Sequence, residues 1–340
     1  MNSLNHSIKK ACLIFACLFA LSIPIVWGSL FFTNYQGDLT RVGKWMESDF
    51  GWRESQPSID PKLLVSSALQ EADVLVIGDS FSENLHWQSV LTQSGKKVAT
   101  IHWGAIGFIC KDFSKQLKAS GFRGKQIIIQ AIERGAFRQF EKSVDCTTNK
   151  SIAPNTNRTS SPIAASIPTD PIFNINGQFI AGLETIMHSV AIRVSPHYSK
   201  IHNYKSKGTY IHPIENGCNY FSHQLCQYGL FFHEDYKRPP LTEKTIEHIK
   251  TLKKRLSDYQ TVWVVIPNKS LIYQQKSSTE VNQTFWKAIQ EAKLGPNLYT
   301  ATQYQKNITK DLYLPNDTHY GPSGYIFAGE QIAKYLKSNR

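Results

Sequence analysis

Two short motifs, far apart in the chain, carry residue types that can perform nucleophilic catalysis. Gly78-Asp79-Ser80 follows an apolar run, and Asp317 and His319 lie two residues apart in LPNDTHYGPSGY, residues 314–325. A serine hydroxyl becomes a nucleophile when a base removes its proton, and an imidazole held by a carboxylate is such a base near neutral pH. The pattern predicts Ser80 as nucleophile, His319 as base and Asp317 as its orienting group. The alternatives are that Ser80 is only a helix N-cap, worth about 1 kcal/mol, and that His319 is a structural loop histidine.

Both motifs are expected at one edge of a parallel β-sheet. Short apolar runs rich in β-branched residues are spaced by helix-length segments, which is typical of parallel strands with crossover helices. The runs cover 74–78, 98–103, 127–132 and 261–267. Helices are predicted from Thr242, near 278–292 and after Pro322, with a short strand near 297–300. The pattern predicts a doubly wound α/β sheet covered on both faces, in which the two motifs meet at the carboxyl ends of the strands.

These motifs resemble those of the SGNH (GDSL-like) hydrolase superfamily, over roughly 72–135 and 260–337. That family has a flavodoxin-like, three-layer α/β/α fold, with its serine after the first strand and its Asp and His before the last helix. The spacing D-x-H followed by aromatic Tyr320 is similar to the alginate-type polysaccharide O-acetyltransferase branch, as are VIPNKSLIY at 265–273 and the N-terminal apolar segment. In that branch D-x-H precedes the serine, whereas here it follows, as in ordinary members of the superfamily.

An acyl ester attacked by serine develops an oxyanion, which needs preorganised hydrogen-bond donors. The Ser80 N–H at the start of a helix is one candidate. The resemblance assigns Gly107 in HWGAIGF as a second donor, with Gly104 as the fallback. The family's asparagine after the third strand is replaced by Glu133-Arg134, so Arg134 is a candidate third donor; its alternative role is an ion pair with an acidic neighbour.

Two further residues are predicted to contact substrate. Lys269 in the PNKS turn and Tyr320 in the D-x-H loop both fall within the segments that resemble the acetyltransferase branch. The alternative for Lys269 is a solvated loop charge.

The N-terminus predicts membrane attachment and export. Lys9 and Lys10 precede an uncharged stretch from Ala11 to Phe32, which as a helix would span roughly 33 Å, close to the thickness of a bilayer core. Positive charges hold the N-terminus in the cytoplasm. We therefore expect a single-pass anchor (1–32) in the inner membrane, a juxtamembrane segment (33–70) and a periplasmic catalytic domain (71–340). A signal peptide cleaved near Gly28 is the alternative.

The cysteines agree with an oxidising compartment. Beyond the anchor there are four cysteines, which allow three connectivities. Cys218 and Cys226 close the shortest loop and are the preferred pair. Buried free thiols and a zinc site are the alternatives, although no CxxC or HxxxH spacing supports a metal. No metal or other cofactor is predicted.

A long excursion separates the third and fourth predicted strands. Its first part, 143–170, is rich in Ser, Thr, Asn and Pro and predicts a loop, and 188–240 is dense in Tyr, His, Phe and Lys. Such an insert, at about 143–240, either overhangs the ligand-binding edge of the sheet or forms a small packed subdomain. The two are compatible.

The net charge of +12 permits an acidic polymer or a membrane surface as partner, but the basic residues are scattered and no nucleic-acid-binding motif is present. The resemblance implies an O-acetyltransferase that acts on an exported polysaccharide through a seryl acyl-enzyme, with a membrane-bound O-acyltransferase as donor partner. The alternatives are a carbohydrate esterase using the same residues and a non-catalytic glycan-binding subunit of an export complex.

Overall fold

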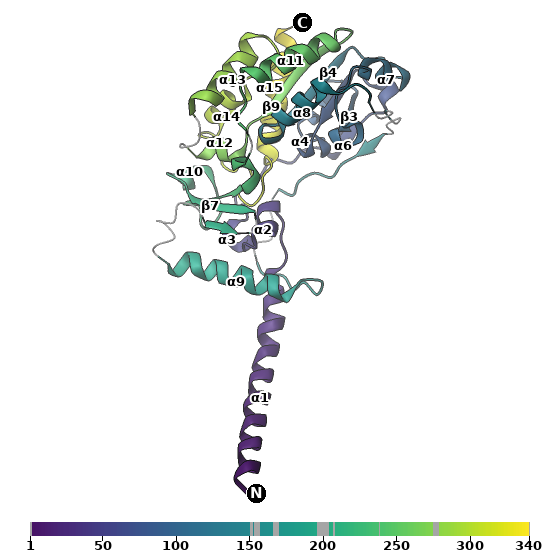
Figure 1. Cartoon of the computed structure of the whole chain (residues 1–340). Coiled ribbons are helices and arrows are strands. Elements are labelled where there is room, and N and C mark those ends of the chain that lie inside the picture. The colour runs from purple at the N-terminus through teal and green to yellow at the C-terminus, as the bar shows by residue number, and fades with distance from the viewer. Residues whose placement is uncertain are drawn as a thin grey trace.

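The computed structural model describes residues 2–149, 152, 157–165, 170–195, 204–206, 208–237, 239–274 and 279–339. A long N-terminal helix, α1 (Asn2–Ser29), stands away from the body of the molecule like a stalk (Figure 1). The body has two lobes along the stalk direction. The lobe far from the N-terminus contains the main β-sheet, and the lobe next to the stalk contains a smaller one.

The main sheet has four parallel strands in the order β3-β2-β4-β9. They are β2 (Val74–Gly78), β3 (Val98–His102), β4 (Gln126–Ile132) and β9 (Gln260–Ile266). All four match the apolar runs of the sequence to within a residue or two. Because the strands are parallel, their carboxyl ends share one edge of the sheet, and the chain after β2 and after β4 emerges there.

Alternate residues of each strand enter opposite hydrophobic clusters, so both faces of the sheet are covered. In β2, Leu75 and Ile77 belong to one cluster, and Val74 and Val76 to the other. The first cluster is completed by α6 (Trp103–Ile106), α7 (Phe113–Ala119), α8 (Glu133–Asp145), α11 (Glu243–Arg255) and α13 (Thr279–Glu291). The second is completed by α4 (Ser80–Glu83), α5 (Ser89–Gln93), α12 (Lys269–Tyr273), α14 (Leu298–Gln305) and α15 (Pro322–Ser338).

One predicted element is wrong. The segment near 297–300, expected as a strand, begins helix α14. The Asn297 side chain caps this helix by accepting from the Thr300 N–H at 3.0 Å, and Leu298 and Thr302, four residues apart, are buried. The spacing of buried residues is therefore helical, which a window of four residues does not reveal. The helix predicted from Thr242 is confirmed, with a capping box at Thr242 and Thr245.

The lobe next to the stalk is built from two distant parts of the chain. An antiparallel sheet in the order β6-β7-β8 comprises Tyr204–Ser206, Thr209–Pro213 and Tyr228–Phe232. It packs with α2 (Asp38–Gly43), α3 (Glu47–Phe50) and α9 (Phe179–Val194). Leu39, Trp45 and Phe50 share a cluster with Ile192, Ile211 and Leu230. The segment that follows α1 therefore folds onto the chain between β4 and β9. The predicted loop 143–170 falls partly outside the described residues, and it contains the two-residue strand β5 (Arg158–Thr159), which pairs with β1 (Val65–Ser66).

Two disulfides are formed. Cys218–Cys226 is confirmed, and it closes the turn that includes the short helix α10 (Gly217–Tyr220). Cys110–Cys146 joins the loop after α6 to the end of α8. Cys12 and Cys17 are free and exposed on α1. The pairing is consistent with an oxidising compartment.

Within the described part of the chain, one helix is long and apolar enough to cross a membrane. This stretch runs from His6 to Phe32, and none of its apolar window is buried against the rest of the protein. The helix continues into a 3-10 turn at Leu30–Phe32.

Candidate active site

Ser80 lies at the turn that joins strand β2 to helix α4. The side chain of Asp79, not Ser80, caps the helix by accepting from the Phe81 N–H at 3.0 Å. Asp79 also accepts from the Ile132 N–H at 2.6 Å and from Gln130 Nε2 at 3.0 Å, which ties the turn to β4. Ser80 is thus the first residue of the helix, and its half-buried side chain is free of a capping role.

The structure brings Ser80, His319 and Asp317 together in one hydrogen-bonded chain. His319 Nε2 lies 2.8 Å from Ser80 Oγ, and His319 Nδ1 lies 2.6 Å from Asp317 Oδ1. Asp317 Oδ1 also accepts from the His319 N–H at 2.9 Å, which fixes the D-x-H loop locally. The predicted convergence of the two motifs is confirmed. In this arrangement Nδ1 faces the carboxylate, so Nε2 is the nitrogen that can take a proton from the serine.

The protonation states suit this arrangement. Burial alone would lower the pKa of His319, but the hydrogen bond and charge of Asp317, with a further contribution from Asp38, outweigh it and raise the pKa. Burial opposes ionisation of Asp317, yet its hydrogen bond to His319 and the charge of that imidazole hold the pKa of Asp317 well below its usual range. The carboxylate is therefore ionised and stabilises a positive imidazole.

Asp38 is a second carboxylate at the D-x-H loop, residues 314–320. Its Oδ1 accepts from the Thr318 N–H at 2.8 Å, and its Oδ2 accepts from Thr318 Oγ1 at 2.6 Å and lies 3.9 Å from His319 Nδ1. Its own N–H donates to Asp317 Oδ2 at 3.0 Å. Burial, followed by the charge of Asp317, raises the pKa of Asp38 to about 6. Sequence reasoning missed this residue, since no motif or spacing links it to residues almost 280 positions away.

The segment after the stalk packs against the D-x-H loop and supports it. The backbone N–H groups of Leu39 and Thr40, in the first turn of α2, donate to the Asn316 carbonyl at 3.0 and 3.2 Å. Asn316 Nδ2 donates to Glu47 Oε2 at 2.8 Å. Gly37 packs so closely that a Cβ there would lie 2.0 Å from the Asn316 carbonyl oxygen. The D-x-H loop thus depends on residues just beyond the predicted membrane anchor.

Lys269 and Tyr320 do not face a substrate site, which corrects the prediction for both. Lys269 is 2% exposed, and its Nζ donates to the carbonyls of Leu314 and Pro315 at 2.8 Å and of Asp317 at 3.1 Å. Burial lowers the pKa of Lys269 to about 7, opposed by nearby carboxylates, with Asp317 first. Tyr320 is fully buried, with its ring 4.3 Å from that of Tyr313. Both side chains therefore pack on the buried side of the D-x-H loop and support it.

The expected oxyanion donors are present only in part. Among the described residues, the Ser80 N–H has no hydrogen-bond acceptor, so it is available to a ligand. The Gly107 N–H, in contrast, donates to the Trp103 carbonyl at 2.7 Å and closes the turn after α6. The Gly104 N–H donates to His102 Nδ1 at 3.0 Å. The prediction of Gly107 as a free donor is therefore wrong for this conformation, because its backbone, with φ of 75°, is already used to end the helix.

Glu133 and Arg134, at the start of α8, both link elements of this edge. Glu133 Oε2 accepts from the Asn268 N–H at 2.8 Å, and burial raises the pKa of Glu133 to about 8. The Arg134 guanidinium pairs with the buried Asp235 at 3.2 Å and lies 5.2 Å from the centre of the Phe232 ring. The ion-pair alternative for Arg134 is confirmed. An oxyanion role would require the guanidinium to serve Asp235 and a ligand together.

A cavity of about 440 Å³ opens at the same sheet edge. It is lined by residues following β3 and β4 and by the second lobe: Trp103, Gly104, Gly107, Phe108, Ile132, Arg134, Gly135, Arg138, Gln139, Phe232 and Glu234. Ile132 lies in the cavity wall, and its N–H donates a hydrogen bond to the side chain of Asp79, the neighbour of Ser80. The wall therefore combines aromatic rings with arginine side chains next to the serine turn.

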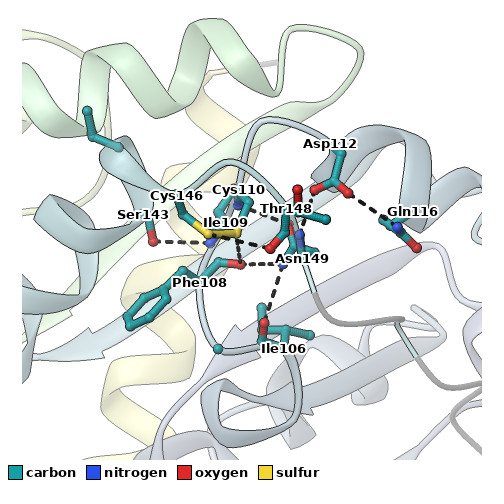
Figure 2. The surroundings of a disulfide bond; sticks show 12 residues. Ile106, Phe108, Ile109, Cys110, Asp112, Gln116, Ser143, Cys146, Thr148 and Asn149 are labelled. Atoms are coloured by element: carbon teal, nitrogen blue, oxygen red, sulfur yellow. Dashed lines mark hydrogen bonds between the residues drawn. A yellow bond between two sulfur atoms is a disulfide. The ribbon is translucent and has the colours of Figure 1, made fainter.

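The Cys110–Cys146 disulfide lies beside residues 106–110, of which Gly107 and Phe108 line this cavity. Figure 2 shows the disulfide and the hydrogen bonds around it. Asn149 Nδ2 donates to the carbonyls of Ile106 and Phe108, and Asn149 Oδ1 accepts from the Cys110 N–H at 2.9 Å. Residues 106–110 are thus held on both sides of Gly107. This fixes the backbone that faces the cavity.

The site also contains a possible group of metal ligands. Asp38, Asp317 and His319 offer ligand atoms within 4.8 Å of one another, and no other such cluster occurs in the described chain. However, every carboxylate oxygen of the pair already accepts a hydrogen bond from Thr318, His319 or the Asp38 N–H. The donor set is satisfied by the protein itself, which favours an acid–base role over metal binding.

Comparisons with protein-family models, with curated proteins and with solved structures each found no match to this chain.

Proposed function

We propose that this protein is a membrane-anchored, SGNH-like serine acyltransferase that O-acetylates an exported polysaccharide. The observation that carries the proposal is the aligned chain from Ser80 Oγ to His319 to Asp317, at 2.8 and 2.6 Å. These distances are those of a nucleophile, a base and the group that orients the base. Ser80 is half-buried, so it is not closed off from the solvent.

The strand order supports the SGNH-like fold as part of this proposal. Numbered along the main sheet only, the order β3-β2-β4-β9 reads 2-1-3-4, which is that of a flavodoxin-like sheet without its fifth strand. In such sheets ligands bind at the switch point between the first and third strands. Ser80 follows β2 at this point. The predicted insert 143–240 contributes β6, β7, β8 and α9 to the second lobe.

The proposed reaction has two half-reactions. His319 Nε2 takes the proton of Ser80 Oγ as the oxygen bonds to the acetyl carbonyl carbon, and the Ser80 N–H supports the oxyanion. The donor's leaving group departs with the proton from His319, leaving acetyl-Ser80. A sugar hydroxyl then loses its proton to His319 and attacks the acetyl carbon. The ester bond to Ser80 breaks, and Ser80 regains its proton.

The location and partners belong to the same proposal. The apolar helix α1 and the two disulfides support a single-pass inner-membrane protein whose body lies in the periplasm. A membrane-bound O-acyltransferase is the proposed source of the acetyl group. The cavity wall, with Arg134, Arg138 and aromatic rings, suits a sugar acceptor that carries acidic groups.

The test uses the full-length protein in nanodiscs, its Ser80→Ala variant, and Ser94→Ala as a matched control. Ser94 Oγ donates to the Leu91 carbonyl at 2.7 Å at the end of α5 and takes no part in the site. Each protein is incubated with an activated acetyl ester, with and without acidic or neutral oligosaccharides. Mass spectrometry then follows the protein and the sugars.

Acetyl-enzyme and acetylated sugar from the wild type and Ser94→Ala, but not from Ser80→Ala, would support the transferase. Acetate release without acetylated sugar would indicate the esterase instead, since water and a sugar compete for the same acyl-enzyme. The absence of any Ser80-dependent acyl-enzyme would refute both enzymes and favour a glycan-binding subunit.

A further inference from the structure

Helix α9 carries an apolar stripe on its solvent side. Ile180, Met187, Val190 and Val194 are all exposed, with Met187 at 64% and Val194 at 71%. Together with the partly buried Leu183, they are spaced three, four, three and four residues apart, which places them on one face of the helix. An exposed stripe of this length is costly in water and indicates a surface that something apolar covers.

The opposite face of α9 packs on the body. Thr185, Ser189 and Ile192 are buried, and Ser189 Oγ donates to Asp49 Oδ2 at 2.6 Å. Ile192 belongs to the cluster of the second lobe. Because helical residues advance by 100°, this buried face lies almost diametrically opposite the exposed stripe. The stripe therefore points away from the lobe that contains α2 and α3.

Helix α9 crosses the end of α1 at close range. At Gly182 a Cβ would lie 2.1 Å from the Ser29 carbonyl oxygen, so the two helices touch through their backbones. Tyr35, just beyond α1, hydrogen-bonds Thr185 Oγ1 at 2.7 Å. Figure 1 shows α9 running across the direction of α1, below the second lobe and on the side toward the N-terminus.

The segment before α9 adds aromatic side chains at the same level. Phe173 stacks on Trp27 of α1 with the ring centres 5.8 Å apart, and it contacts Phe31 at 5.2 Å. The Asn174 N–H donates to the Leu30 carbonyl at 3.3 Å. Ile172 and Ile175 are exposed beside them. Aromatic residues at the end of a spanning helix are typical of the membrane–water interface.

From this arrangement we infer that α9 and residues 171–178 lie in the interface of the outer leaflet of the bilayer that α1 crosses, with the apolar stripe in contact with lipid. The inference rests on α1 being retained as a membrane span and is independent of the enzymatic proposal. The occupant is lipid because the stripe faces away from the second lobe, on a helix that touches the end of α1 and lies across it on the side toward the N-terminus. The span and the interfacial helix together would fix the height and tilt of the body above the membrane. They would thereby also fix the height of the Asp38–Asp317 contact.

Site-directed spin labelling in nanodiscs of phosphatidylethanolamine and phosphatidylglycerol tests the inference. The background is the full chain with Cys12→Ser and Cys17→Ser, which leaves both disulfides intact. Nitroxides are placed at Met187→Cys and, in a separate protein, at Val190→Cys. Tyr304→Cys, which replaces a 70% exposed residue of α14 in the lobe far from the stalk, is the aqueous control. Leu18→Cys, in the middle of α1, is the lipid control.

The readout is the ratio of relaxation by oxygen, which concentrates in lipid, to relaxation by a water-soluble nickel chelate. We expect this ratio to exceed unity at positions 187, 190 and 18 and to fall below unity at position 304. Nickel-dominated relaxation at 187 and 190, with position 18 in lipid, would overturn the inference. Low access of both reagents at 187 and 190 would show a protein cover, such as a second copy, and would also overturn it. A nickel-accessible position 18 would remove the span on which it rests.

Discussion

Replacing Asp38 with asparagine removes one negative charge beside the D-x-H loop while keeping a side chain of the same shape. The amide oxygen can still accept from the Thr318 N–H, which Asp38 Oδ1 does at 2.8 Å. What is lost is the carboxylate 3.9 Å from His319 Nδ1. Because Asp38 raises the pKa of His319, the substitution should lower that pKa.

The size of the effect follows from Coulomb's law. Two unit charges about 4 Å apart interact by about 1 kcal/mol in bulk water and by about 4 kcal/mol at an effective dielectric constant of 20. The Asp38 side chain is 28% exposed, so solvent screening favours the lower end of this range. We expect the pKa of His319 to fall by about one unit, which corresponds to about 1.4 kcal/mol.

The assay is the pH dependence of acetyl transfer or ester cleavage by the full-length protein. His319 must be neutral to accept the serine proton, so activity is lost as the pH falls through its pKa. A lower pKa moves this acid limb of the profile to lower pH by about one unit. In the wild type, Asp38, with a pKa of about 6, titrates in coupling with His319, so the limb reports the pair, whereas in the variant it reports His319 alone.

Asp258→Asn is the matched control, because Asp258 pairs with Lys118 on the exposed surface and should leave the limb in place. An acid limb unchanged by Asp38→Asn, in a protein that folds and keeps its plateau activity, would refute the electrostatic role of Asp38. A limb that moved to higher pH would show that the sign of the argument is wrong.

Three further perturbations test how the loop and the cavity are held. Lys269→Met removes the ammonium that binds three loop carbonyls. Without these contacts we expect His319 to shift from its position beside Ser80, which should lower kcat roughly tenfold with little change in KM. The free energy of unfolding, measured in urea, should fall by about 2 kcal/mol. Lys306→Met, which loses a single carbonyl contact outside the loop, should retain kcat. Replacing both Cys110 and Cys146 with serine opens a loop with a sequence separation of 36. On the loop-entropy model this should lower the free energy of unfolding by roughly 4 kcal/mol. An unchanged melting temperature would contradict this expectation. EDTA treatment should leave activity unchanged, because the carboxylates of the site are satisfied by the protein; inactivation reversed by one added metal would show that the cluster is a metal site.

Local sequence patterns determined the parts of this protein that depend on neighbours in the chain. The four strands are continuous apolar runs, because strands buried on both faces expose no polar side. The helix after Thr242 has its own cap, and the N-terminal helix has its own length and apolarity. The positions of Ser80 and of the D-x-H loop followed from the rule that parallel strands share a carboxyl edge.

The roles of Lys269, Tyr320 and Gly107 were decided by tertiary contacts. A lysine in a turn is usually solvated, but this one is buried beside the rings of Phe221 and Phe231, and its Nζ donates to loop carbonyls. Tyr320 is buried within the second hydrophobic cluster. The Gly107 N–H already donates to the Trp103 carbonyl at the end of α6. Sequence could name these residues as important to the site, but the direction in which each side chain or N–H points depends on the packing around it.

Asp38 marks the limit of sequence reasoning most clearly. Nothing in its local sequence distinguishes it from a surface aspartate, and its partners Thr318 and Asp317 lie almost 280 positions away. Its raised pKa and its proximity to His319 exist only because the segment after α1 folds back onto the D-x-H loop. The sequence by itself therefore determined the strands, the stalk and the three residues of the candidate triad. The tertiary structure alone decided which further groups set their charge and position, because burial and electrostatic coupling arise from proximity in space and not along the chain.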